Sequence, residues 1–374
     1  MSTTTHAPIA ALEPWLQLRS VPALKFSELV TLLRRFGESS EHLIRANSQD
    51  LLRAGLSEVQ ISALKTPQAG KIESISNWLS KCENHRVLTL QDDDYPELLL
   101  QLSSPPLLLY CCGDVNCINK YQLAIVGSRK ASAQGKKITA DFAGKLAMSG
   151  WVITSGMAMG IDRYAHQGAL QNNGQTVAVL GTGVNRIYPQ RNQDIYDSIV
   201  EGGGCVISEF DLNTPPKPFH FPRRNRLISG LSQGVLVIEA DVKSGSLVTT
   251  KYALEQNREI FAIPGSIYNP LSKGCHQLIK QGAKLVEQVS DINEEFAEFP
   301  LEAENLDTKN PEKNLKQGLA TDQLLASVGY EATPLDVVVQ RSGLPVKVVL
   351  AKLLEYELRG LLVAVPGGYS RLGE

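Results

Sequence analysis

Residues 123–130 read LAIVGSRK, an apolar run that ends in a glycine and three polar residues. Five similar runs follow, with helical stretches between them: WVITSG (151–156), TVAVLG (176–181), CVISE (205–209), GVLVIEA (234–240) and EIFAIPG (259–265). Near-continuous apolar strands that alternate with helices are typical of a parallel sheet covered on both faces. Residues 86–292 are therefore predicted to form an α/β domain with a Rossmann-like, doubly wound, mostly parallel sheet.

Residues 1–85 are predicted to form a small helical domain of the SAM or helix-hairpin-helix type. Apolar residues recur there at spacings of three and four, as in Phe26, Leu29, Leu32, Leu33 and Phe36. Ala23 stands where the hairpin of such a domain would carry a glycine in its tight turn. We therefore expect this domain to serve packing or a partner contact rather than DNA binding.

The C-terminal part divides into a linker and a third domain. Residues 293–318 are polar and acidic without an apolar period, which indicates a linker. Residues 319–374 contain three helical stretches and two short strands around Gly367 and Gly368, the pattern of a winged helix. Its third helix carries acids among its bases, so both protein contact and groove reading stay open.

Composition places the chain among folded proteins. Of its 374 residues 43% are hydrophobic and 20% are charged, which suits two or three globular domains. No apolar run reaches the ~18 residues of a membrane span, and the first residues lack a secretory signal, so we expect a cytoplasmic protein without membrane contact. The net charge of −2 means that nucleic-acid binding would need a local basic patch.

The six cysteines are expected to be reduced thiols, as is usual for a protein of the cytoplasm. Cys111, Cys112 and Cys117 lie close together in the sequence, but they have no second CxxC pair and no nearby histidine. We therefore predict buried thiols and no metal site.

The loops after the predicted strands are where a doubly wound sheet binds ligands. Gly127, Ser128 and Arg129 precede a helix that Ser132 can cap, and this combination suits a phosphate group. The loop at Ser155 also allows close approach of the backbone, because Gly156 follows it. Neither these loops nor the one at residues 181–183 complete the GxGxxG fingerprint, which argues against a classical dehydrogenase.

Residues 212–238 contain no acid and are rich in bases, with aromatic residues among them. The bases there are Lys217, His220, Arg223, Arg224 and Arg226, the aromatic residues are Phe219 and Phe221, and we expect Arg223 and Arg224 to be exposed. Cations neutralise phosphates and aromatic rings stack with bases, which together favour single-stranded nucleic acid. Without acids nearby, such bases would repel one another unless an anion were bound.

Lys243, Ser244 and Gly245 come between the run GVLVIEA (234–240) and a further helix, and form a second helix start suited to an anion. The GLSQG sequence at 230–234 matches a hydrolase motif but lacks the strand–turn–helix order that a nucleophile needs. No Walker sequence is present, and His166 and His276 are interpreted as polar or packing residues. We predict no catalytic residue, no cofactor and no enzymatic activity.

These motifs together resemble the DprA/Smf family of DNA-processing proteins. The resemblance rests on IVGSR (125–129), SGMAMGID (155–162), AVLGTG (178–183), ISEF (207–210), FPRRNRLISGLS (221–232), KSGSLVTT (243–250) and FAIPG (261–265). It covers residues 90–290, with the helical and winged-helix domains in the family's usual order.

The resemblance implies a homodimer that binds single-stranded DNA without ATP and without cutting it. It also implies that the protein protects incoming DNA in natural transformation and recombination, and loads the RecA recombinase where single-strand-binding protein competes. By motif match the DNA contacts would be Gly127, Ser128, Arg129, Ser155, Gly156, Lys217, Phe221 and residues 223–226.

Two other functions stay open at this point. A nucleotide-hydrolysing enzyme of the lysine-decarboxylase-like Rossmann group would share the sheet, but its PGGxGTxxE signature is absent. A sequence-specific repressor would act through the winged helix, whose third helix has little net positive charge.

Overall fold

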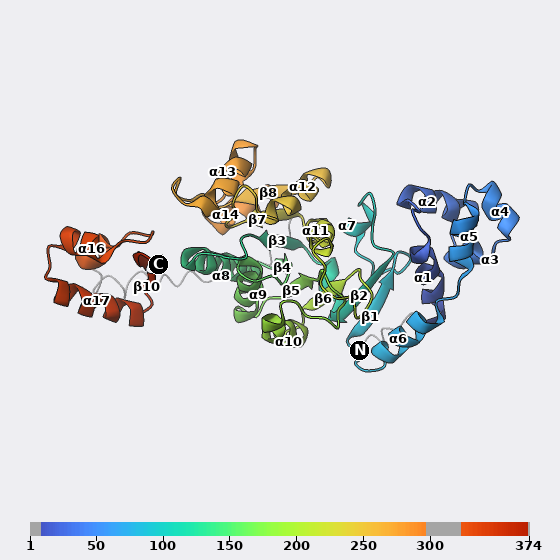
Figure 1. Cartoon of the computed structure of the whole chain (residues 1–374), viewed down its shortest axis with the longest axis horizontal. Coiled ribbons are helices and arrows are strands. Elements are labelled where there is room, and N and C mark those ends of the chain that lie inside the picture. The colour runs from blue at the N-terminus through green and yellow to red at the C-terminus, as the bar shows by residue number, and fades with distance from the viewer. Residues whose placement is uncertain (1–8, 297–322, 373–374) are drawn as a thin grey trace.

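The computed structural model describes residues 9–296 and 323–372, in which three bodies follow the chain order (Figure 1). The first body is helical: η1 (Ile9–Ala11), α1 (Leu12–Ser20), α2 (Phe26–Arg35), α3 (Ser40–Arg45), α4 (Ser48–Arg53), α5 (Glu58–Lys65) and α6 (Ala69–Leu79). The last body consists of α15 (Gln323–Ser327), α16 (Leu335–Ser342), α17 (Val346–Leu358) and the hairpin of β10 (Leu362–Val365) and β11 (Gly368–Arg371). The predicted helical domain and winged helix are both present.

The central body is built on a sheet of nine strands. They are β1 (His85–Thr89), β2 (Leu108–Gly113), β3 (Gln122–Val126), β4 (Val152–Ser155), β5 (Thr176–Val179), β6 (Cys205–Ser208), β7 (Gly234–Val237), β8 (Glu259–Ala262) and β9 (Lys284–Leu285). Their order is β1-β2-β6-β5-β4-β3-β7-β8-β9. The six predicted strands are confirmed as β3 to β8, all of them parallel.

Three strands at the edges of the sheet were not predicted. β1 pairs with β2, and β2 with β6, in antiparallel register, while β9 adds two residues beside β8. The buried run Leu108–Gly113 lies outside the alternation of strand and helix that marks a parallel sheet, so its pattern did not identify it. The prediction of a mostly parallel, doubly wound sheet is nevertheless confirmed.

The helices of the core are α7 (Glu97–Leu100), α8 (Ala133–Met148), α9 (Ile161–Gln171), α10 (Gln193–Glu201), α11 (His220–Gly230), α12 (Ser246–Glu255), α13 (Lys273–Lys280) and α14 (Val289–Asn293), with short turns η2 (Val115–Asn119), η3 (Gln190–Asn192), η4 (Pro270–Ser272) and η5 (Glu294–Phe296). α11, α12 and α13 pack on one face of the sheet, and α8 and α9 pack on the other. Alternate residues of β3 supply the two faces: Ala124 and Val126 pack towards α11, and Leu123 and Ile125 pack towards α8 and α9.

At β3 the order in which the chain adds strands to the sheet reverses. From β3 the chain builds β4, β5 and β6 on one side, then crosses to β7 and β8 on the other. The loops after β3 and β7 therefore diverge, and the gap between them is where doubly wound sheets bind their ligands.

Residues 293–296, at the predicted start of the linker, belong to the core. Asn293 ends α14 and accepts a hydrogen bond from the indole of Trp151, and the Phe296 ring packs edge-on to the same indole at 5.2 Å between centroids. The prediction that the linker starts at 293 is therefore wrong, because aromatic packing holds these residues on the sheet. The remainder of the predicted linker, residues 297–318, lies outside the described residues.

The tight turn predicted to need a glycine forms around an alanine. Ala23 has φ +53°, a left-handed conformation that costs a residue with a Cβ about 1 kcal/mol or more. We expect Ala23→Gly to raise Tm by about 2 °C, because relief of this strain exceeds the added chain entropy.

The matched control is Ala63→Gly in the middle of α5, which should lower Tm because glycine weakens a helix. Both variants are followed by circular dichroism. A lower Tm for Ala23→Gly would contradict the inference that the backbone at Ala23 is strained.

Candidate nucleic-acid interface

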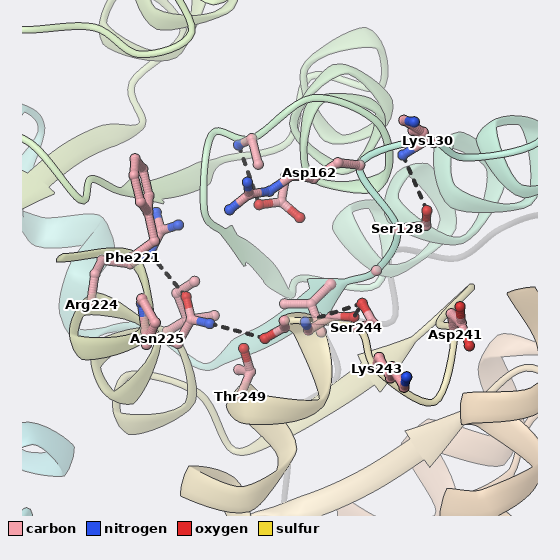
Figure 2. A pocket seen from close by; sticks show the side chains of 18 of the residues that line it. Ser128, Lys130, Asp162, Phe221, Arg224, Asn225, Asp241, Lys243, Ser244 and Thr249 are labelled. Carbon is pink, nitrogen blue, oxygen red and sulfur yellow. Dashed lines mark hydrogen bonds between the residues drawn. The ribbon is translucent and has the colours of Figure 1, made fainter. Parts of the chain in front are cut away.

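A cavity of about 680 Å³ opens between the strand ends at β3 and β7 (Figure 2). Its wall is formed by the loop after β3, the N-terminal half of α11, and the loop that leads from β7 into α12. The predicted residues that line it are Gly127, Ser128, Arg129, Phe221, Arg224, Asn225, Lys243, Ser244 and Gly245. Segments separated by more than 100 residues thus meet as the loop argument expected.

The loop after β3 needs its glycine. A Cβ at Gly127 would lie 2.6 Å from the Ile161 side chain and 2.9 Å from the Glu239 carbonyl oxygen, so a larger residue would displace one of them. The Ser128 N–H donates to that carbonyl at 2.7 Å. The loop is therefore held against the end of β7.

The loop leads directly into α8. Ser132 caps the helix as predicted, because its hydroxyl accepts from the Gly135 N–H at 2.9 Å. Glu239 accepts from the Ser132 hydroxyl at 2.5 Å and from its N–H at 2.9 Å. Sequence reasoning missed Glu239, a buried acid that joins the two sides of the cavity.

Arg129 and Phe221 meet across the cavity. The Arg129 guanidinium lies 5.5 Å from the centre of the Phe221 ring, a cation–π distance. A Cβ at Gly181 would lie 2.8 Å from that ring, so the glycine makes room for it. Tyr188, which sequence reasoning did not assign to the site, lines the cavity with its ring 5.6 Å from that of Phe221.

Arg224 corrects a prediction. We expected an exposed cation, but its side chain is 3% exposed and its guanidinium donates to the carbonyl oxygens of Gly156, at 2.5 Å, and Val179. Arg223 and Arg224 are neighbours on α11, and successive residues of a helix point about 100° apart, so Arg224 falls on the side that faces the sheet while Arg223 is exposed. Arg224 forms the floor of the site.

The carboxyl group of Asp162 lies beside Arg224. Both groups contact Gly156, where a Cβ would meet Asp162 Oδ2 at 2.7 Å and the Arg224 guanidinium at 2.8 Å. Burial lowers the pKa of Arg224 to about 10, and burial raises the pKa of Asp162 although Arg224 opposes that shift. The loop at Ser155 and Gly156 therefore supports the site from below. The Ser155 hydroxyl is buried and donates to the Ile125 carbonyl oxygen at 2.6 Å.

The acid-free run has its counter-ion elsewhere in the sequence. Glu209, at the end of β6, pairs with Arg223 at 3.3 Å and also with Arg226. Arg226 donates in addition to the Ser104 carbonyl oxygen at 2.8 Å and is 15% exposed, whereas Arg223 is 61% exposed. The expectation that these bases need a bound anion is therefore wrong, since an internal acid is present. Arg223 is more accessible to a ligand than Arg226.

Two predicted residues of this region, Lys217 and Asn225, differ in their position relative to the cavity. Lys217 is exposed outside the cavity and lies 5.8 Å from the ring of Phe219, which is also exposed. Asn225 lies inside the cavity wall and donates to the Gly245 carbonyl oxygen at 3.4 Å. Lys217 therefore extends the basic surface beyond the cavity.

A second helix start faces the first across the cavity. Ser244 precedes α12, and its hydroxyl lies 2.5 Å from that of Ser246, whose N–H also points at it. Figure 2 shows Lys243 and Ser244 on one side of the cavity and Ser128 and Lys130 on the other. N-terminal N–H groups carry partial positive charge, so the two helix starts and their lysines form a site for anions.

The remaining candidates from the sequence serve packing. His166 is buried with Nδ1 2.7 Å from the Thr176 hydroxyl, and burial lowers its pKa to about 3. The hydroxyl of Ser232 is buried and donates to the Ile228 carbonyl oxygen at 2.9 Å. All six thiols are free, with Cys82 exposed and the other five buried.

Two searches of the described ranges gave negative results. Residues 9–296 and 323–372 contain no group of three His, Cys, Asp or Glu side chains placed to hold a metal ion. In the same ranges, no helix is both long and apolar enough to cross a membrane.

The fold and cavity define a Rossmann-like protein with a cationic site at its strand ends. The chain belongs to the family described as DNA recombination-mediator protein A, whose model matches residues 86–297, and the DprA winged helix domain matches residues 312–368. The predicted DprA/Smf membership is confirmed.

Known relatives cover most of the chain. It is 43% identical to Protein Smf of Escherichia coli over 364 residues, which is 96% of each chain. It is 45% identical to DNA processing protein DprA of Streptococcus pneumoniae over 208 residues, 56% of this chain and 73% of that one.

Solved structures of the family share the fold. The DNA processing protein A of Streptococcus pneumoniae superposes with a TM-score of 0.65 at 34% identity, over 78% of this chain and 99% of that one. The protein of Helicobacter pylori, studied for its single-stranded DNA binding mode, superposes with a TM-score of 0.52 at 29% identity, over 57% of this chain and 96% of that one.

Proposed function

We propose that this protein binds single-stranded DNA in the cavity between β3 and β7 without ATP and without cutting it. The observation that carries the proposal is the convergence of two helix starts, Arg129 and the Phe221 ring on one cavity. N–H groups and a guanidinium suit a phosphate, and a ring beside them suits a base. Relatives named as DNA processing proteins support it.

The contacts outside the cavity extend the proposed path of the strand. Arg223, Lys217 and Phe219 continue the surface of α11 on the solvent side. A strand bound this way would be held through phosphates and stacking, with little dependence on sequence. Arg224, Ser155 and Gly156 would act by holding the loops in place.

The role in the cell follows from family membership and is part of the proposal. A homodimer in the cytoplasm would protect incoming DNA during natural transformation and recombination, and would promote loading of RecA where single-strand-binding protein competes. The alternative is hydrolysis of a nucleotide, for which the Asp162 and Asp241 carboxyl groups at the cavity would be candidates.

Fluorescence anisotropy with labelled single-stranded and duplex oligonucleotides, across a salt series and without nucleotide, tests the proposal. Preference for the single strand with a steep fall in affinity as salt rises would support it. Absence of binding at low salt by folded protein would overturn it. Release of base or phosphate from added nucleotides would favour the hydrolase.

Arg129→Ala should weaken single-strand binding about tenfold and reduce the slope of log affinity against log salt by about 0.7, the value for one lost phosphate contact. The charge-matched control is Lys145→Ala, an exposed position near the far end of α8. Equal losses in the two variants would show a general charge effect and place the strand elsewhere.

A further inference from the structure

An exposed apolar row runs along the whole of α17, the third helix of the winged-helix domain. Val346, Leu350, Leu354 and Leu358 recur at intervals of four residues and are 49%, 41%, 58% and 82% exposed. We call these four residues the α17 row. Large apolar side chains gathered in one line on a surface mark a contact with another molecule.

The domain does not need the α17 row for its own core. The adjoining face of the helix buries Val349, Leu353 and Tyr356 against α15, α16 and β10. This core is closed within the winged-helix domain. Replacing residues of the row should therefore leave the fold intact, since they are on the solvent side.

The row is poorly suited to DNA, although the third helix of a winged helix is the usual reader of the major groove. A groove reader presents polar and cationic side chains to bases and phosphates. Here the row offers only hydrocarbon, and the acids Glu355 and Glu357 lie near its C-terminal end. A protein surface is the better match.

We propose that the α17 row is a contact between two copies of this chain, with the two α17 helices antiparallel. Residues four apart form a ridge, and two such ridges pack into each other's grooves at a crossing angle of about −50°. Leu350 of one copy then lies against Leu354 of the other, near the two-fold axis.

Charge selects the antiparallel arrangement. The N-terminal half of α17 carries Lys347 without an acid, and the C-terminal half carries Glu357 and Glu355, the latter paired with Arg359 at 3.4 Å. With Leu350 against Leu354, antiparallel pairing puts Lys347 of each copy beside Glu357 of the other, and it also aligns the helix dipoles favourably. Parallel pairing would put like charges together. A surface complementary to itself is what a two-fold contact requires.

The contact is small, so it is weak in isolated protein. A helix of 13 residues is about 20 Å long, which cannot bury the roughly 1,200 Å² of a stable interface. Copies held along one strand of DNA would meet at high effective concentration, where a weak contact becomes significant. This last step rests on the proposed function, whereas the contact itself does not.

Cross-linking of the full-length protein tests the proposal. In a Cys82→Ser background, which removes the exposed native thiol, Ala351→Cys places one thiol beside the row near the expected two-fold axis. A short bis-maleimide should link two copies through it. The control Asp336→Cys, exposed on α16, should give several-fold less product. Adding Leu354→Glu to Ala351→Cys should abolish the excess.

Sedimentation velocity gives a second readout. Leu350→Glu with Leu354→Glu should lower the concentration-dependent association of the wild type about tenfold, and the control pair Ala332→Glu with Gln340→Glu should not. Single-strand affinity at dilute protein should be equal in the wild type and in both double variants, which separates this contact from the DNA site. Equal cross-linking of the two cysteine variants, or unchanged association in the leucine variant, would overturn the proposal. These are also the results expected if a different protein covers the row.

Discussion

Arg224→Met should lower the free energy of unfolding by about 3–5 kcal/mol, the usual cost of removing one partner from a buried ionic contact. Methionine fills a similar volume, but it leaves the Gly156 and Val179 carbonyl oxygens without their donor and Asp162 without its cation. Urea unfolding followed by circular dichroism measures the loss. Arg223→Met, at a side chain that is 61% exposed, is the control and should cost about 1 kcal/mol or less.

The loss in Arg224→Met should depend on pH. Burial already raises the pKa of Asp162 in the folded state, and removing Arg224 raises that pKa further, so the folded state favours the protonated carboxyl group. Stability from such a group is present at low pH and is lost as pH rises. The variant should therefore be closer to wild type at pH 5 than at pH 8, and Asp162→Asn should rescue part of the loss. A loss independent of pH, without rescue, would show that Asp162 is not coupled to Arg224.

Gly160→Ala should lower the free energy of unfolding by about 3 kcal/mol and abolish most single-strand binding. Gly160 has φ +75° and ψ −130°, which only glycine adopts without strain, and a Cβ there would lie 2.3 Å from the Ser128 carbonyl oxygen and 2.7 Å from that of Arg129. The alanine would push the loop after β3 out of the cavity, because the Ile161 N–H holds that loop through Ser128.

Gly245→Ala is the matched control on the opposite wall of the cavity. Its backbone is in the ordinary helical region, and nothing lies within 4 Å of a Cβ added there. Thermal unfolding and anisotropy on both variants separate backbone strain from simple crowding of the cavity. Binding by Gly160→Ala at the affinity of Gly245→Ala would contradict the placement of the strand at the loop after β3.

The sequence predicted the sheet because its parallel strands are buried on both faces. Residues such as Leu123, Ile125 and Val177 form apolar runs that few other structures produce. From six such runs, the meeting of the loops at Ser128 and Ser244 followed from the topology alone. The antiparallel strand β2 is as apolar, but it is followed only by the short turn η2 and not by an α-helix, and so gave no signal of its place.

The direction of individual side chains could not be predicted in the same way. Arg223, Arg224 and Arg226 are indistinguishable by residue type, yet one is exposed, one is buried under the site and one is tied to Glu209. These differences depend on the rotation of α11 against the sheet and on an acid in another strand. The helical period of residues 220–230 was the only signal for these directions, because it places neighbouring residues about 100° apart around the helix.

The helical domain and the sheet share one hydrophobic core. Trp15, Leu16 and Trp78 pack in the same cluster as Leu108 and Tyr110 of β2, and Arg19 pairs with Asp211 in the loop that follows Glu209. Removal of residues 1–85 would expose the apolar residues at the antiparallel edge of the sheet, and such an exposed apolar edge is prone to aggregation. Residues 9–296 should therefore unfold as one cooperative unit. A partner bound at Arg19 of the helical domain would compete for Asp211, two residues from the Glu209 that pairs with the arginines of α11.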